Sequence, residues 1–170
     1  MPQEPVDPEG LDWRRVSPQY ATVRLVGTAI TALVFTAVLS VPLVLRLTGV
    51  WPGYPAWLAW GVPAVVAVLF LVYLAVIPRQ VRALGYAERD DDLLVRSGIL
   101  FQQVLVVPYG RMQYVDVAVG PIDRALGLCT VQLHTAAGSV TASIPGLPAA
   151  EGARLREQLS ARGEARLAGL

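Results

Sequence analysis

Two long runs without a charged side chain limit most strictly what this chain can fold into. Residues 25–45 and 57–77 each hold 21 residues, and none of them is Asp, Glu, Lys or Arg. As helices, these runs would each be about 31 Å long, close to the hydrocarbon thickness of a bilayer. A core helix of a soluble protein rarely lacks a polar face over such a length. The sequence therefore predicts a membrane hairpin over residues 25–77, with two spanning helices and a short loop.

The charges and aromatic side chains around the two runs predict an orientation. Arginines flank the hairpin on its outer sides, at Arg14, Arg15, Arg24, Arg79 and Arg82, whereas the loop holds only Arg46. Positive charge stays on the cytoplasmic side of a membrane. Tryptophan and tyrosine gather in and beside the loop, as they do at a membrane interface. We expect a multi-pass protein of the bacterial inner membrane with both termini in the cytoplasm. A cleaved signal peptide is disfavoured, because the first run is too long and no small-x-small cleavage site follows it.

Small side chains form a stripe on the first run. Thr28, Ala32, Thr36 and Ser40 recur every four residues, so they share one face of a helix. Small residues allow a neighbouring helix to approach closely. That neighbour is either the second run, which offers Gly61, Ala64 and Ala67, or a second copy of the chain. We prefer packing within one chain, with at most a weak homo-oligomer. Neither run contains an ionisable group that would suggest an ion path.

After Arg82 the periodicity changes from helical to the alternation of β-strands. The segments that alternate or end in turn residues are 83–88, 93–97, 101–107, 112–119, 129–135 and 139–144. Residues 120–128 read as a short helical connector, and residues 148–162 as a terminal helix with Leu155 and Leu159 inward and Arg154 facing water. About six short strands with glycine-containing turns predict a small antiparallel β-barrel or sandwich with a C-terminal helix.

Few side chains are candidates for chemistry. The chain has one cysteine, Cys129, one histidine, His134, and a net charge of +1. No catalytic motif or phosphate-binding glycine loop is present. Cys129 lies on the apolar face of its strand, and the acidic run 90–92 is more typical of a solvated turn than of a cation-binding loop. We expect no enzyme activity, no metal, no cofactor and no nucleic-acid partner.

Four segments resemble a known family. These are residues 93–98, 108–116, 120–128 and 144–147, in this order behind a two-span hairpin. In this respect the chain resembles the bacterial pleckstrin-homology (PH) family of membrane proteins, the YdbS-like group. The resemblance covers about residues 15–160. It implies two transmembrane helices followed by a cytoplasmic PH-like domain with a C-terminal helix, and it carries no established catalytic residue.

These observations together predict an organisation and a role. We expect a cytoplasmic tail over 1–24, the hairpin 25–77, a PH-like domain over 79–163 and a tail over 164–170. Besides the bilayer, the expected partner is a membrane or cytoplasmic protein, bound by a non-enzymatic interaction or assembly module. The alternative is an accessory subunit of a membrane transport or enzyme complex.

The first candidates for a binding site are Arg111 and Arg124, which flank the expected strand 112–119. Specific capture of anionic lipid headgroups is disfavoured, because residues 79–170 hold ten arginines against nine acidic residues.

Overall fold

The structure is a computed structural model that describes residues 12–135 and 140–167. The chain forms two compact units. One consists of Thr22–Pro78, and the other combines the segment up to Ala21 with Arg79–Leu170. The second unit therefore draws on chain from both sides of the first. Residues 1–11 of the expected tail 1–24 and residues 168–170 of the expected tail 164–170 lie outside the described residues.

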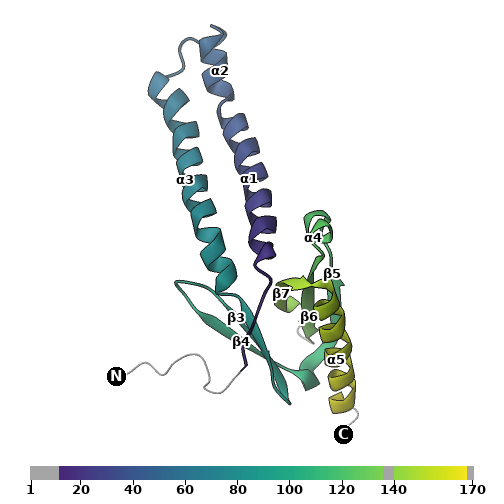
Figure 1. The fold of residues 1–170 in the computed structure, drawn as a ribbon. Helices are drawn as coiled ribbons and strands as arrows, with labels where there is room; N and C mark the ends of the chain where they lie inside the picture. Colours follow the sequence, from purple (N-terminus) through teal and green to yellow (C-terminus); the bar gives the residue numbers. More distant parts are fainter. Residues whose placement is uncertain (1–11, 136–139, 168–170) are drawn as a thin grey trace, which may run out of the picture. The chain divides into compact units, whose positions relative to one another are not determined.

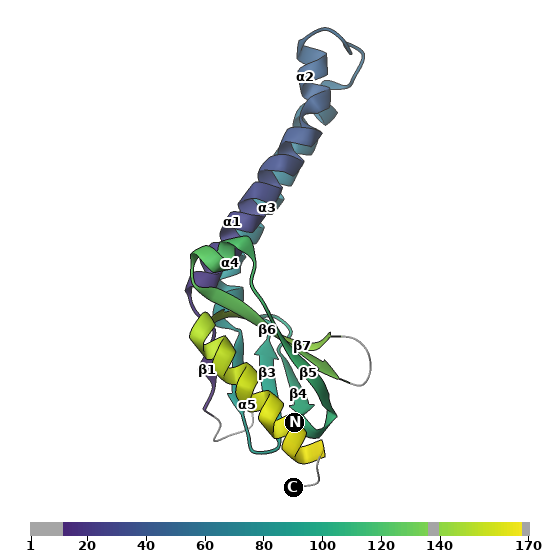
Figure 2. The ribbon, with the colours of Figure 1, turned by 90° about the vertical axis from the view of Figure 1, so that its right-hand side faces the viewer.

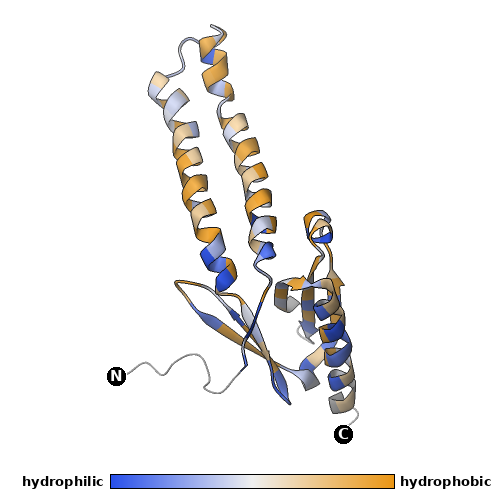
Figure 3. Ribbon diagram, viewed as in Figure 1, coloured by the Kyte–Doolittle hydropathy of each residue, from blue (hydrophilic) through white to orange (hydrophobic). Residues whose placement is uncertain are grey.

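Three helices make up the first unit, and the first and last of them extend a few residues beyond its bounds. They are α1 Gln19–Leu39, α2 Val41–Leu47 and α3 Ala56–Arg82 (Figure 1). Together α1 and α2 form one candidate membrane span, Gln19–Leu47, and α3 forms the other. The break at Ser40 has a local cause, because Pro42 in the first turn of α2 cannot donate a backbone hydrogen bond. Figure 3 shows apolar residues over most of both spans. The two predicted apolar helical segments are confirmed, and the candidate spans, of 29 and 27 residues, are longer than the predicted runs.

Side-chain contacts join the two spans at more than one position along their length. The rings of Phe35 and Phe70 lie 6.3 Å apart, and Arg24 Nη2 donates a 2.9 Å hydrogen bond to the Tyr73 hydroxyl. The four small residues of the α1 stripe are all half-buried, whereas neighbours such as Leu33 are 72% exposed. On α3, Gly61 and Ala67 are half-buried and Ala64 is exposed. The stripe therefore lies on the covered side of α1, and Ala64 does not belong to the matching surface.

Two antiparallel sheets make up most of the second unit. The first has the order β1-β2-β3-β4, formed by Arg14–Arg15, Gly85–Glu88, Asp92–Ser97 and Gln103–Pro108. The second has the order β5-β6-β7, formed by Met112–Ala118, Leu128–Thr135 and Val140–Pro148. The 3-10 turn η1 Tyr109–Arg111 joins the sheets, and α4 Pro121–Ala125 connects β5 to β6. No ladder closes the sheets into a barrel in the described part of the chain. The predicted antiparallel strands and C-terminal helix are confirmed, as two sheets and α5.

The helix α5 Ala149–Leu167 completes the core of the second unit. It packs against η1, β5 and β6, and Figure 2 looks onto its outer face. Its Leu155 and Leu159 are fully buried, as are Val131 and Leu133 of β6. These four inward positions were predicted correctly from the sequence. The helix lies close to β6 at Gly152, where a methyl group would overlap the Cys129 sulfur.

The segment before the first span is part of this unit. Arg14 and Arg15 pair with Tyr86 and Gly85, and Val16 is buried. The Ser17 N–H donates a 2.9 Å hydrogen bond to the Gly146 carbonyl. Gly146 has a φ of +71°, and any side chain there would overlap Tyr20. The sequence analysis did not predict β1, because a strand of two residues has no alternation to recognise.

Candidate functional site

The two arginines singled out in the sequence lie at opposite ends of β5. Arg111 ends η1 directly before the strand, and Arg124 lies in α4 behind it. Both side chains are exposed. A strand advances about 3.3 Å per residue, so the 7 residues of β5 separate them by about 23 Å. The structure therefore does not bring them together, although Arg111 lies beside the groove described next.

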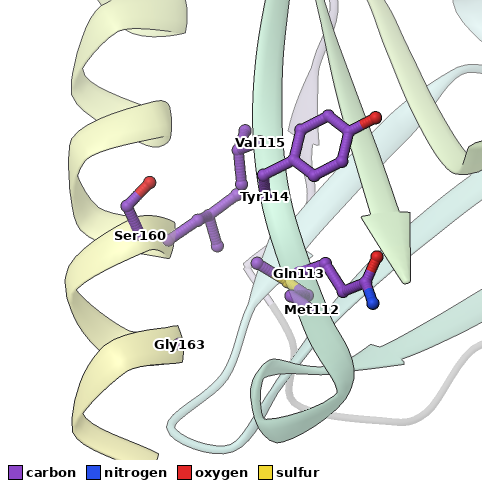
Figure 4. A pocket seen from close by; sticks show the side chains of 7 residues that line it. Met112, Gln113, Tyr114, Val115, Ser160 and Gly163 are labelled. Carbon is purple, nitrogen blue, oxygen red and sulfur yellow. The ribbon is translucent and has the colours of Figure 1, made fainter. Parts of the chain in front are cut away.

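A groove of about 210 Å³ separates the first half of β5 from the last turns of α5 (Figure 4). Buried Met112 and Leu159 form its apolar floor, and Gln113, Tyr114 and Ser160 are exposed around it. In Figure 4 the Val115 side chain lies on the side of β5 that faces α5, and the Tyr114 ring lies on the other side. The groove thus combines an apolar floor with a polar rim, as ligand and peptide sites do.

The backbone of β5 has a free edge. Among the strands that the structure describes, β5 pairs only with β6. The Val117 N–H is bonded to the Asp116 Oδ1 at 2.8 Å, so it points away from β6. Outward and inward donors alternate along an antiparallel strand, which places the Val115 N–H on the same outer edge. An edge of this kind is a template for another strand, and a charged residue such as Asp116 is a common means of restraining unwanted pairing.

A β-bulge and a stacked aromatic pair determine which side chains lie on the exposed face of β5. The register between β5 and β6 shifts between Met112 and Tyr114, which leaves Gln113 unpaired. The Tyr114 ring then stacks on His134 of β6, with centroids 4.2 Å apart and planes 12° from parallel. Tyr114 remains 56% exposed. An exposed, rigidly held tyrosine is a frequent anchor in protein interfaces.

Arg162 fixes the end of the groove next to η1. Its Nη1 donates 3.0 Å hydrogen bonds to the Arg89 carbonyl and to the Tyr109 hydroxyl, and its guanidinium lies 5.3 Å from the centroid of the Tyr109 ring. Tyr109 also donates to the Arg89 carbonyl. Burial raises the pKa of the Tyr109 hydroxyl, so it stays protonated and able to donate. These contacts hold η1, and with it the start of β5, against α5.

A polar cluster ties three elements of the same unit together. Glu151 of α5 accepts hydrogen bonds from Arg14, Tyr86 and Arg154. Arg154 also contacts Glu88 at 2.7 Å, so it is not on the water-facing side where the sequence analysis placed it. The Arg154 hydrogen bonds lower the pKa of the Glu151 carboxyl to about 2, and burial raises the pKa of Tyr86 to about 12. General acid–base catalysis needs a pKa near the working pH. The cluster is therefore suited to joining elements, not to transferring protons.

The remaining candidates for chemistry have structural surroundings. Cys129 is buried against Gly152, and this burial raises the pKa of its thiol, which disfavours the reactive thiolate. Across residues 12–135 and 140–167, no group of three or more His, Cys, Asp or Glu side chains could hold a metal ion. The groove and the free edge were missed in the sequence analysis. The adjacent polar or exposed side chains of Gln113 and Tyr114, which interrupt the alternation at the start of β5, were the local signal for them.

Comparison with known proteins relates this architecture to others. A family model described as "Bacterial PH domain" matches residues 23–163, which include most of the first span, all of the second and most of the two sheets. The UPF0699 transmembrane protein YdbS of Bacillus subtilis (strain 168) is 29% identical over 161 residues, covering 94% of this chain and 92% of that protein. No solved structure matches the chain.

Proposed function

This chain belongs to the bacterial PH domain family, and from that premise we propose that it is a membrane-anchored interaction module without enzymatic activity. It is a transmembrane protein with a bacterial PH domain. In the proposed role, the groove between β5 and α5 binds an extended segment of a partner protein. The segment adds to the sheet as a fourth strand beside β5.

The observation that carries this proposal is the free edge of β5 beside a groove. The Val115 N–H points outward along it, and so does the Val117 N–H, which would exchange its Asp116 acceptor for the added strand. In strand addition, main-chain hydrogen bonds supply affinity, and neighbouring pockets select side chains of the added segment. Here the groove floor at Met112 and Leu159 would take an apolar side chain, and the exposed Arg111 at its end favours an acidic residue nearby.

The proposed location is the bacterial inner membrane, with the PH domain in the cytoplasm. The arginines on the outer flanks of the hairpin support this orientation. Pairing of β1 with β2 supports a hairpin that crosses the membrane twice, because β1 precedes the first span and β2 follows the second. Two paired strands must lie on the same side of a bilayer.

A peptide selection with a matched pair of variants tests the proposal. Displayed random peptides would be selected against the full chain in lipid nanodiscs, and their affinity measured for Ser160→Tyr and Ala161→Tyr. Both residues are exposed on α5, but only Ser160 lines the groove. We expect Ser160→Tyr to weaken binding about tenfold or more, a loss of about 1.4 kcal/mol, and Ala161→Tyr to leave it unchanged. Bound peptide should also slow amide hydrogen exchange in residues 112–118.

Two results would contradict the proposal. One is a set of selected peptides that bind Ser160→Tyr as well as the unmodified chain. The other is protection of a different strand, with exchange in β5 unchanged. Recovery of a stoichiometric transport ATPase or membrane enzyme from mild detergent, unaffected by Ser160→Tyr, would instead favour the accessory-subunit alternative.

A further inference from the structure

We propose that the hairpin tip formed by residues 99–101, between β3 and β4, inserts into the surface of the bilayer that the chain's own helices span. The tip holds Ile99, Leu100 and Phe101. The ligand is the lipid itself, at the level of the headgroups and upper acyl chains. This surface is separate from the β5 groove and does not depend on the proposed function.

The exposure of the tip is unusual for a turn. Leu100 is 91% exposed, Phe101 85% and Ile99 38%. Turns are normally built from Gly, Pro, Asn, Asp and Ser, whose side chains tolerate water. Three consecutive large apolar residues at the end of a hairpin would instead be stabilised by an apolar environment.

The bend is set before any lipid is bound. Gly98 has a φ of +96°, and its backbone lies so close to the Phe101 carbonyl that a methyl group there would overlap it. Ser97 and Gln103 still pair on the two sides of the turn. The apolar residues are therefore presented on a short, closed turn, and little conformational entropy is lost when they enter the interface.

The strand register places the tip at the end of the sheet that is connected to the spans. Arg96, close to the end of β3, pairs with Gly85. Gly85 comes three residues after Arg82, the last residue of α3, and it also pairs with Arg15, four residues before α1 begins at Gln19. The tip thus extends from the same end of the sheet at which the chain enters one span and leaves the other.

Charge separates the two ends of this sheet. The turn at the opposite end, between β2 and β3, carries the exposed Asp90 and Asp91, and its one arginine, the half-buried Arg89, lies 3.9 Å from an Asp92 carboxylate oxygen. The end with the apolar tip carries Arg15 and Arg82, both exposed. A bacterial bilayer with anionic headgroups attracts arginine and repels aspartate, so the charges favour the same orientation as the apolar tip. Apolar exposure, connectivity and charge together favour lipid over a protein as the occupant.

A fluorescent label at the tip tests the insertion. In a Cys129→Ala background, Leu100→Cys would be labelled with the dye NBD in the full chain, reconstituted in vesicles of phosphatidylethanolamine and phosphatidylglycerol. Asp90→Cys at the opposite turn is the matched control. We expect the label at position 100 to emit at shorter wavelength, to be quenched several-fold more strongly by spin-labelled acyl chains, and to be shielded from aqueous iodide.

A second pair of variants shows whether the label itself causes insertion. Phe101→Glu should return the label at position 100 to water, whereas Gln103→Glu, an exposed position on β4, should not. Equal iodide quenching at positions 90 and 100 would overturn the proposal. Shielding of position 100 from both iodide and spin-labelled lipid would also overturn it, because protein would then cover the tip.

Discussion

At the scale of single residues, Glu151 makes the stability of the domain depend on pH. Hydrogen bonds from Arg154 and Tyr86 lower the pKa of its carboxyl from 4.5 to about 2. Between these values the unfolded chain binds a proton that the folded chain does not, so this stabilisation is complete above about pH 4.5 and is lost towards pH 2. We expect Glu151→Gln to lower the free energy of unfolding at pH 7 by about 1.5–3 kcal/mol, and this deficit to disappear near pH 2.

Urea unfolding in detergent micelles would measure this difference, followed by Trp13 fluorescence with Trp51, Trp57 and Trp60 changed to Phe. Glu157→Gln is the control, because Glu157 is exposed on the same helix. Its effect should stay within about 0.5 kcal/mol. A deficit of Glu151→Gln that remained unchanged at low pH would mean that the carboxylate charge does not stabilise the cluster.

At the scale of elements, the segment of residues 13–20 depends on a glycine far along the chain. Gly146 and Gly127 both have positive φ, at +71° and +65°. An added methyl group would overlap Tyr20 at Gly146 but would meet open space at Gly127. Both alanine variants carry a similar backbone strain of about 1–2 kcal/mol. We expect only Gly146→Ala to release residues 13–20, seen as faster amide exchange at β1 and Ser17. Equal exchange in the two variants would show that the Tyr20 contact does not hold the segment.

At the scale of the whole molecule, the orientation of the hairpin decides which compartment the PH domain meets. We expect Trp51–Tyr54 outside the cytoplasm and both termini inside it. Alkaline phosphatase needs an oxidising compartment, so it should be active when inserted between Trp51 and Tyr54 and inactive when fused after Leu170. A fluorescent protein that matures in the cytoplasm should give the reverse pattern. Phosphatase activity at the C-terminal fusion would place the PH domain on the other side.

The sequence alone determined the features that depend on the local order of residues. Two uncharged runs predicted the spans, because a bilayer excludes charge over a known thickness. Alternation in β5 and β6 predicted which residues face the core: Val131 and Leu133 are buried, and Val115 and Val117 are half-buried, opposite exposed Tyr114 and Asp116. The family-like segments were sufficient to identify the family, because their order can be read from the sequence without knowing which residues are in contact.

Only the tertiary structure decided the features that depend on which distant segments meet. The chain order cannot show that β5 pairs with β6 alone, so the free edge and its groove were invisible in the sequence. Likewise, Arg154 was assigned to water because its distant partner Glu88 comes within reach only when α5 packs beside β2. The apolar tip lies at the end of the sheet connected to the spans because the register between β2 and β3 pairs Arg96 with Gly85. In each case the feature depends on contacts between segments that are far apart in the sequence, and local periodicity does not encode such contacts.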